Sequence, residues 1–387
     1  KRLKTLSQTP YQNLLNWIYF GLYLGSIVPE IWLDYGITNV VLDIKAENLE
    51  QNIDSDGKVL EDAAIQEKLG KLNLSKPNEI VVLHDSKAVQ KILSTLYMMC
   101  EQKSKPFPQI FADKRILNQV KHQLPEGSTI SEFGDSELSN ANLVFLGEME
   151  FNGLFGFETI ATRLIKKFGK DEMLSAYAKR KESLPSPGHI GESMEEAKKF
   201  TNNFEIQGIE VVANSKGIVD LSVGHPSSTI SLSKTLEGFG MKDVGEHKTM
   251  VISTGKDASN DTLARSLSSL WNCSSSIKKD GLAVLLAECK NGVGSHAIEQ
   301  FIEGRLSVER IKNPTRYIDG MEDLLFLTEI QKKFQIALVS ILPELYAKRL
   351  NMISLNSTKH AMDYILKTQG VRQKVEVISD GARLLLR

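Results

Sequence analysis

The sequence predicts an α/β protein with two lobes and mostly parallel sheets, and three observations support this fold class. Short apolar runs typical of buried strands alternate with segments whose apolar residues recur at helical spacing. The alternation continues along most of the 387 residues, with no internal repeat or low-complexity tract. The composition, 41% apolar and 25% charged, is that of an ordinary globular protein, and at roughly 150 residues per domain the length predicts two or three domains.

Strand and helix patterns alternate through the first half of the chain. Residues 40–44 and 79–84 are expected as strands, and Ser86 is expected to begin a helix. The apolar stripe of that helix, at spacing i, i+3, i+4 and i+7, consists of Val89, Ile92, Leu93 and Leu96. Further strand patterns lie at 109–111 and 143–146, and further helical patterns lie at 114–122, 159–168 and 194–203.

One antiparallel pair is expected within this alternation. The β-rich runs 209–214 and 218–223 are separated by only three residues, Ser215, Lys216 and Gly217. Such a connection is typical of a short hairpin.

The alternation resumes after 238–248, a stretch in which three glycines interrupt the periodicity. Strands and helices are then expected in turn at 250–253, 261–271, 282–287, 295–303, 336–340, 343–350, 357–368 and 375–378. We predict an N-terminal extension 1–34, an N-terminal α/β domain 35–243 and a C-terminal α/β domain 244–387. Ligands of such sheets bind beyond the carboxyl ends of strands, so we expect a cleft there, near the loops after His84, Leu146, Ser253 and Ala287.

The N-terminal extension contains an aromatic-rich apolar run at 18–28. The run is about half of the ~20 residues that cross a bilayer, so we predict no membrane segment and favour a buried or docking helix. The aromatic side chains of the extension predict either packing on the chain's own domain or self-association. They are Trp17, Tyr19, Phe20, Tyr23 and Trp32.

Charge and cysteine content exclude several classes of protein. Lys and Arg number 47 against 48 Asp and Glu, and the net charge of −1 argues against nucleic-acid binding. Cys100, Cys273 and Cys289 are far apart and odd in number, so they form neither a zinc motif nor a disulfide framework. A cytoplasmic location is therefore expected.

The common nucleotide and metal motifs are missing from the sequence. Residues 255–257, Gly-Lys-Asp, lack the hydroxyl of a Walker loop, and 292–294, Gly-Val-Gly, lack the third glycine of a dinucleotide fingerprint. The seven histidines form no i, i+4 pair, so no metal site is predicted. His84 stands out because it ends an expected buried strand beside Asp85, although a satisfied core histidine is the simpler interpretation.

Residues 287–295, Ala-Glu-Cys-Lys-Asn-Gly-Val-Gly-Ser, resemble the A-E-C-x-x-G-x-G element of the nickel-dependent lactate racemase family. Further segments resemble that family in the same order, and they are Tyr35-Gly36 with LDIKAENL, GESMEEAKKF with VVANSKGIVDLSVGHP, and 378–381. The resemblance extends from residue 35 to the end of the sequence. It implies a lactate racemase-like fold with the active site in a cleft between two lobes.

The resemblance also implies a chemistry. In active members of the family, a pyridinium nucleotide tethered to a lysine holds nickel as a pincer, with a histidine as a further ligand. A hydride is taken from the substrate α-carbon while one of two histidines removes the hydroxyl proton. An arginine can grip the substrate carboxylate bidentately.

Several of the family's chemical positions carry other residues in this sequence. The Asp-x-Thr-Arg motif keeps only its aspartate, as Asp85. The family's His-Arg pair meets Lys114 and Arg115, which replaces a base by a cation. The ends of the Gln-x-x-Lys motif meet Arg265 and Ser268, so its lysine is missing as well.

The positions of the tether, the metal ligand and the second base are also changed. Asn152 stands where the second catalytic histidine belongs, and an amide cannot take a proton. The tether loop meets Glu158 to Thr162, and Thr162 has no amine where the family has its lysine. The adjacent Arg163 is a poor nucleophile because its guanidinium stays protonated. No histidine occurs near 177–179, where the nickel ligand would lie, so no cofactor and no metal are predicted.

We therefore expect a diverged lactate racemase-like protein without the nickel-pincer cofactor, acting as a binding protein or pseudoenzyme for a small carboxylate or phosphate. The alternative is an active racemase or epimerase of a 2-hydroxy acid with a rearranged base, such as His84, Glu158 or His189. A lysine at the tether position, such as Lys166 or Lys167, would favour that alternative, although both lie in a charged helical stretch typical of a solvated face. The candidate cleft residues are Asp85, Lys114, Arg115, Asn152, Glu158, Thr162, Arg163, Arg265 and Ser268.

Overall fold

The computed structural model describes most of the chain. The described residues are 30–36, 38–72, 79–114, 116–122, 124, 128–134, 143–180, 185–255, 257 and 261–387. The helix expected at 18–28, four of the five aromatic residues of the extension and Arg115 lie outside these ranges. Trp32 is described, and it is 62% exposed on β1 (Glu30–Tyr35).

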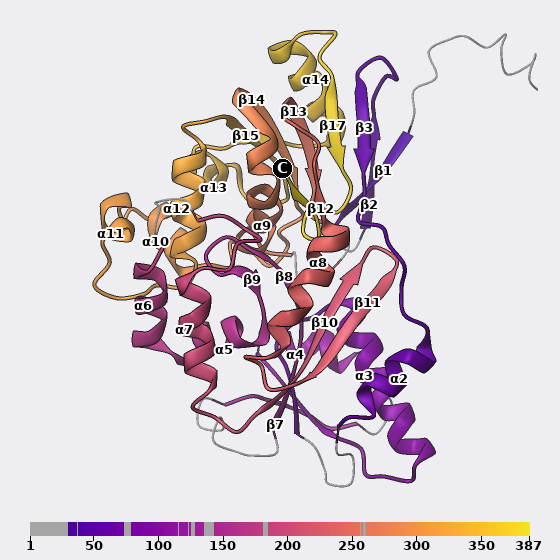
Figure 1. Ribbon diagram of the computed structural model, residues 1–387. Coiled ribbons are helices and arrows are strands. Elements are labelled where there is room, and N and C mark those ends of the chain that lie inside the picture. Colours follow the sequence, from indigo (N-terminus) through magenta and orange to yellow (C-terminus); the bar gives the residue numbers. More distant parts are fainter. Residues whose placement is uncertain are drawn as a thin grey trace, which may run out of the picture.

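Two six-stranded sheets form the framework of the molecule (Figure 1). The sheet of lobe 1 has the order β11 (Gly217–Gly224), β10 (Gln207–Asn214), β7 (Leu143–Glu148), β4 (Glu79–Val82), β5 (Gln109–Ala112) and β6 (Ile130–Glu132). Its pairings are parallel except β10–β11, which is the predicted hairpin. The sheet of lobe 2 is parallel throughout, in the order β16 (Ile353–Leu355), β15 (Gln335–Val339), β14 (Ile277–Leu286), β13 (His247–Ser253), β17 (Val375–Ile378) and β3 (Leu49–Ile53). The predicted fold class, α/β with mostly parallel sheets, is confirmed.

Both faces of the lobe 1 sheet are covered, as parallel strands require. Side chains alternate along β4, so Ile80 and Val82 face α2 (Asp62–Leu69) and α3 (Lys87–Gln102). Val81, between them, faces the core that contains α5 (Ile160–Phe168) and α8 (Ser233–Gly240). Ser86 caps α3 as predicted, because its Oγ accepts a hydrogen bond from the Val89 N–H at 3.2 Å.

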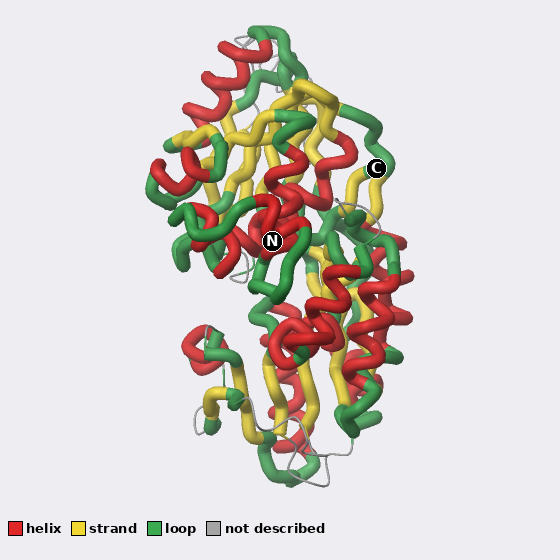
Figure 2. Tube along the Cα trace, turned by 90° about the vertical axis from the view of Figure 1, so that its left-hand side faces the viewer, coloured by secondary structure: helices red, strands yellow, loops and turns green. Residues whose placement is uncertain are grey.

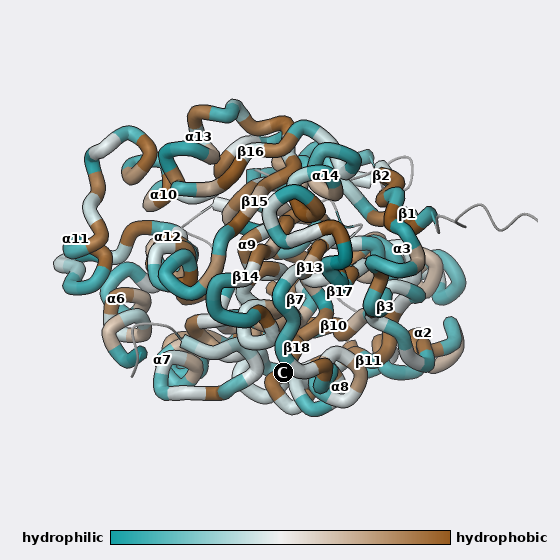
Figure 3. Tube along the Cα trace, turned by 90° about the horizontal axis from the view of Figure 1, so that it is seen from above, coloured by the Kyte–Doolittle hydropathy of each residue, from teal (hydrophilic) through white to brown (hydrophobic). Residues whose placement is uncertain are grey.

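The lobe 2 sheet is covered in the same way. One face packs against α14 (Thr358–Gln369) and against the antiparallel pair β1–β2, where β2 is Thr38–Asp43. The other face packs against α9 (Leu263–Cys273) and α12 (Met321–Ile330). The remaining helices surround these layers and are α4 (Leu117–Lys121), α6 (Lys170–Ala178), α7 (Glu192–Thr201), α10 (His296–Ile302), α11 (Val308–Lys312) and α13 (Glu344–Arg349). Figure 3 shows apolar residues along the central strands and a mixture of hydrophilic and apolar residues in the helices and loops around them.

The two sheets occupy separate parts of the molecule, one above the other in Figure 2. One continuous hydrophobic core nevertheless connects the two lobes. Trp271 of α9 stacks on Phe326 of α12 with ring centroids 4.4 Å apart. A Cβ at Gly153 would lie 2.1 Å from the Trp271 ring, so glycine lets the hairpin β8 (Glu150–Asn152) and β9 (Gly156–Glu158) of lobe 1 reach lobe 2.

The described residues begin and end in lobe 2, with β1 and β18. Strand β3 pairs with β17, and β1–β2 pack on the same sheet, which the sequence did not lead us to expect. The pair β12 (Met241–Lys242) and β18 (Leu385–Leu386) joins the chain end to the segment between the lobes. The domain ranges 1–34, 35–243 and 244–387 stay a prediction, with the addition that 49–53 supply a strand to lobe 2.

The membrane prediction concerns 18–28, which lies outside the described residues. Among the described helices, none combines the length and the apolar character that crossing a bilayer requires.

The helix expected at 114–122 is shorter than predicted, since α4 covers Leu117–Lys121.

Candidate functional site

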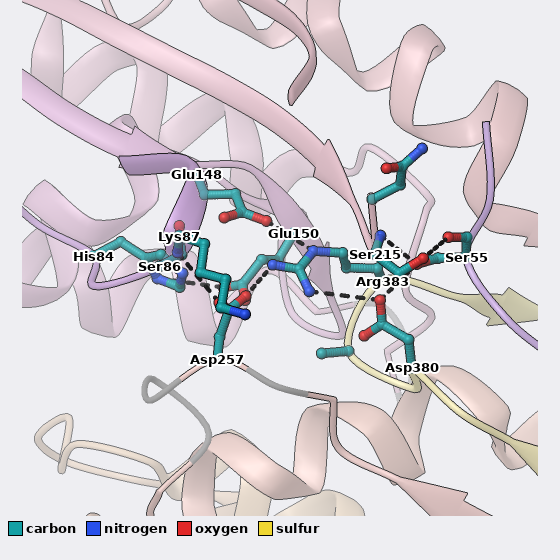
Figure 4. Close-up of polar contacts among 12 residues, drawn as sticks. Ser55, His84, Ser86, Lys87, Glu148, Glu150, Ser215, Asp257, Asp380 and Arg383 are labelled. Carbon is teal, nitrogen blue, oxygen red and sulfur yellow. Dashed lines mark hydrogen bonds and ion pairs between the residues drawn. The ribbon is translucent and has the colours of Figure 1, made fainter. Parts of the chain in front are cut away.

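Loops from the carboxyl ends of strands in both sheets meet between the lobes (Figure 4). In lobe 1 these loops follow β4 and β7, and in lobe 2 they follow β13 and β17. Among the charged or titratable side chains that lie together there are His84, Glu148, Glu150, Asp257, Asp380 and Arg383. This is the sheet edge where α/β proteins bind ligands.

Arg383 is a buried cation that joins the lobes. Its Nε donates to Glu148 Oε1 of lobe 1 at 3.0 Å. Its Nη atoms donate to two carboxylates of lobe 2, Asp257 and, at 3.5 Å, Asp380. Asp380 also accepts a hydrogen bond from Ser55 Oγ at 2.5 Å. Three carboxyl groups therefore surround one guanidinium.

Burial changes the titration of this cluster. It raises the pKa of Glu148 to about 7, against the opposing attraction of Arg383. It also raises the pKa of Asp380. Burial alone would lower the pKa of Arg383, but Asp257 and Glu148 outweigh burial, so the guanidinium stays charged. The lobes are thus joined through a permanent cation and a carboxyl that titrates near neutrality.

A second set of contacts surrounds the imidazole of His84, which is fully buried. Arg163 Nη2, from α5 of lobe 1, lies 3.2 Å from His84 Nδ1. Arg265 Nη2, from α9 of lobe 2, lies 2.8 Å from the same nitrogen. Glu150 Oε2 lies 2.9 Å from Arg163 Nη2 and 3.8 Å from both Arg265 Nη2 and His84 Nδ1. We call these four residues the arginine pair site.

The protonation state of His84 follows from its neighbours. Burial, and then the positive charges of Arg163 and Arg265, lower the pKa of His84 well below its usual value. A guanidinium can only donate, so the neutral imidazole accepts at Nδ1 and carries its proton on Nε2. Nε2 is buried and has no hydrogen-bond partner among the described residues. His84 is therefore a neutral acceptor between two cations.

Lys166 of α5 forms a further bridge between the lobes. Its Nζ lies 2.9 Å from Glu158 Oε2 and 3.5 Å from Glu322 Oε1 of α12. Tyr317 OH donates to the two Glu322 oxygens at 3.2 and 2.9 Å. Burial alone would lower the pKa of the Lys166 amine, but Glu158 and Glu322 outweigh burial and raise it. The interpretation of this stretch as a solvated face is wrong for Lys166, whose side chain is 22% exposed and ion-paired.

The first turn of α5 is closed by its own side chains. Thr159 Oγ1 accepts from the Thr162 N–H at 3.3 Å, and Thr162 Oγ1 accepts from the Thr159 N–H at 2.7 Å, which is a capping box. The buried Glu210 accepts from the Ile160 N–H at 2.9 Å and from Thr229 Oγ1 at 3.2 Å. Burial raises the pKa of Glu210 to about 7. The helix start where the resemblance places a tethered nucleotide is thus occupied by protein hydrogen bonds.

The segment that carries the family resemblance positions Arg265. Gly292 and Val293 O atoms accept hydrogen bonds from the Leu263 and Ala264 N–H groups, at 3.0 and 2.9 Å, at the start of α9. Arg265 follows directly, and its Nη2 lies 2.8 Å from His84 Nδ1. Cys289 in the same segment is buried, and burial raises the pKa of its thiol to about 11, so it is a structural thiol.

Other candidate residues have structural contacts. Asn152 Oδ1 accepts from two backbone N–H groups of its own turn at 2.9 Å, and its Nδ2 donates to Glu158 Oε2 at 2.7 Å. Asp85 is buried and accepts from Gln90 Nε2 at 3.2 Å. Ser268 Oγ donates within α9, to the Arg265 carbonyl at 2.7 Å.

The predicted set is therefore only partly assembled. The contacts described above link Asn152 to Glu158, and Arg163 and Arg265 to His84. Lys114 is exposed on the turn after β5, and His189 is exposed before α7. Arg115 lies outside the described residues.

Sequence reasoning missed several residues of the site. Glu148 and Glu150 lie in the stretch 147–150, Gly-Glu-Met-Glu, shortly before Asn152, but they are not among the predicted residues. Arg383 is a single charge within the apolar run 382–386, and this is the signal that would have identified it, since an unpaired buried charge is costly. Glu322 lies beside Asp323 in the first turn of α12, a common place for acidic residues, so no such signal distinguishes it.

The described residues contain no group of three or more His, Cys, Asp or Glu side chains arranged to hold a metal ion. The three cysteines are buried and free, in agreement with the sequence prediction that they form no disulfide.

The arrangement of two parallel-stranded lobes around a polar interlobe site defines a two-lobed α/β fold. No protein-family model and no curated protein sequence matches the chain. Among solved structures, it is similar to the lactate racemase apoprotein from Thermoanaerobacterium thermosaccharolyticum, with a TM-score of 0.69 and 15% identity over 93% of this chain and 100% of that one. It is also similar to a Thermotoga maritima protein, with a TM-score of 0.62 and 10% identity over 86% of this chain and 100% of that one. The chain therefore has a lactate racemase-like fold.

Proposed function

We propose that this protein binds a small carboxylate or phosphate between its lobes, at the arginine pair site, without a nickel-pincer cofactor. The observation that carries the proposal is the meeting of Arg163 and Arg265, one from each lobe, at a single nitrogen of His84. A ligand held there would contact both lobes at once.

The donors and acceptors at this site favour an anion. Two guanidinium groups share one neutral imidazole nitrogen and one carboxylate, Glu150. Charge-assisted bonds from guanidinium to carboxylate or phosphate are stronger than bonds to a neutral acceptor. An added anion is therefore a better acceptor for the two guanidinium groups than the neutral His84 nitrogen. The Arg265 side chain is 36% exposed, which gives a ligand access from solvent.

The residues at the family's cofactor positions support the cofactor-free part of the proposal. Thr162 has a hydroxyl in place of an amine, and that hydroxyl closes the first turn of α5. Lys166, the nearest lysine on α5, is a protonated partner of Glu158 and Glu322, and a protonated amine is not a nucleophile. Lys179, near the expected nickel ligand, pairs with Glu196. These residues do not fit a tethered nickel nucleotide, so we derive no step through it.

The similarity to a lactate racemase apoprotein suggests which anions to test first. Lactate and malate carry a carboxylate beside a hydroxyl, and inorganic phosphate tests the other anion class. The alternative, an active racemase or epimerase, needs a base at the site. His84 has its pKa lowered well below the usual range by burial and by Arg163, which makes it a weak base.

Isothermal titration calorimetry with lactate, malate and phosphate tests the proposal. The wild-type protein should bind at least one of these anions, and Arg265→Gln should weaken binding by about tenfold or more, because one of the two charged donors is lost. Arg305→Gln is the matched control, since Arg305 is 67% exposed and pairs with its neighbour Glu303 at the surface. Binding that survives in the Arg265→Gln variant, or no binding of any anion, would contradict the proposal.

A further inference from the structure

Glu150 already supplies a carboxylate to the arginine pair site. Its Oε2 is 2.9 Å from Arg163 Nη2 and 3.8 Å from Arg265 Nη2, so one oxygen lies near a cation of each lobe. The same oxygen is 3.8 Å from His84 Nδ1. The Glu150 side chain is 18% exposed and begins the short β8–β9 hairpin, so its backbone belongs to lobe 1.

A second carboxylate cannot join this arrangement without a cost. Two carboxylates at one site repel each other unless one is protonated or withdraws. An incoming anion must therefore compete with Glu150 for the two guanidinium groups. The competitor is tethered to the chain, which gives it a high effective concentration.

We propose that Glu150 is an internal stand-in for the ligand, so that the group bound at this site is a carboxylate that displaces the Glu150 side chain. The inference rests on the proposed anion-binding function and narrows it to one chemical class. The planar carboxylate of Glu150 shows the shape of group that the guanidinium groups accept at this position. Glu150 also acts as a specificity-determining residue, because only an anion that outcompetes it is retained.

The inference predicts chemical rescue. Glu150→Ala removes the atoms of one acetate molecule from the side chain and leaves two arginines without their carboxylate. Acetate should then raise the melting temperature of Glu150→Ala above that in chloride at equal ionic strength, and phosphate should raise it less. Wild-type protein should show a smaller acetate effect, because acetate must first displace Glu150 from the position.

Two controls make the rescue specific. Glu303→Ala also deprives an arginine, Arg305, of its carboxylate, but this pair is at the surface, so acetate should have no effect there. The double variant Glu150→Ala with Arg265→Gln should lose the rescue. An equal acetate effect in Glu303→Ala, a rescue that persists without Arg265, or a larger effect of phosphate would overturn the inference.

A milder variant covers the case in which Glu150→Ala does not fold. Glu150→Gln keeps the packing and removes the charge, and its Kd for the carboxylate that wild-type protein binds should fall by about tenfold as the competing charge disappears. An unchanged Kd in this variant, together with loss of binding in Arg265→Gln, would contradict the stand-in role of Glu150 and leave the proposed anion-binding function standing. If neither wild-type protein nor Glu150→Gln bound any anion, the proposed function itself would fail.

Discussion

Arg383 Nε lies 3.0 Å from Glu148 Oε1, and this contact joins the chain end in lobe 2 to the last residue of β7 in lobe 1. The Arg383 side chain is 9% exposed, and Asp257 and Asp380 complete the surroundings of its guanidinium. At this point of the interface between the lobes, one cation therefore neutralises several buried carboxyl groups. Replacing Arg383 should therefore lower the free energy of unfolding.

Arg383→Met should destabilise the protein by about 3–5 kcal/mol, because it leaves buried carboxylates without their partner. Urea denaturation followed by circular dichroism measures this change. Arg305→Met, at an arginine that is 67% exposed, should change stability by less than about 0.5 kcal/mol. A loss in Arg383→Met as small as that of the control would show that the cluster does not hold the lobes together.

The buried carboxyl of Glu210 should make stability depend on pH. Burial raises its pKa from 4.5 to about 7, so the folded state binds a proton more tightly than the unfolded state. The stabilisation is complete below the unfolded pKa and is lost as pH rises through the folded pKa, in total about 3.5 kcal/mol at ~1.4 kcal/mol per pKa unit. Glu210→Gln mimics the protonated form, so the stability of the variant relative to wild type should rise between pH 5 and 8.

Urea unfolding of both proteins across this pH range gives the difference. The exposed Glu205→Gln variant serves as the control and should show no pH-dependent difference from wild type. A stability difference between Glu210→Gln and wild type that does not change with pH would contradict the raised pKa of Glu210.

The Thr162 hydroxyl should stabilise the folded protein. Thr162→Val keeps the side-chain shape but deprives the Thr159 N–H of its acceptor, which should cost about 1 kcal/mol of unfolding free energy. Thr368→Val removes a hydroxyl that bonds only its own helix, to the Tyr364 carbonyl, and should be close to neutral. Equal stabilities of the two variants would argue against the capping role.

The amine of Lys166 should react slowly with acylating reagents. Glu158 and Glu322 raise its pKa above the usual value against the effect of burial, so less free amine is present at pH 8. Acylation by an N-hydroxysuccinimide ester, read by peptide mass spectrometry, should be about tenfold slower at Lys166 than at the exposed Lys359, since each pKa unit changes the free amine tenfold. Comparable labelling of the two lysines would reveal an available amine on α5.

Local patterns in the sequence predicted most of the fold. The period of apolar residues located α3, and Ser86 marked its first residue, because both features are set within a few neighbouring residues. The three residues between β10 and β11 predicted their antiparallel pairing for the same reason. Strand β3 was not predicted, because only its pairing with β17, at the other end of the chain, makes it part of a sheet.

The site was less predictable than the fold. The family resemblance indicated Arg163 and Arg265, and the structure brings both to His84. It gave no reason to choose Glu150, whose role depends on cations from two lobes. Lys166 looked like a surface residue because its neighbours in sequence are charged, whereas its partner Glu322 comes from the other lobe. Contacts between lobes leave no local pattern for a sequence to display.

The central claim is that this lactate racemase-like fold operates without a tethered nickel nucleotide. The most direct test is the intact mass of the protein, with nickel analysis, after production alongside the enzymes that synthesise the nickel-pincer cofactor. The account predicts the mass of the unmodified polypeptide and no stoichiometric nickel. An added mass of nucleotide size together with one nickel per chain would contradict it, and would mean that another residue provides the tether that Thr162 cannot.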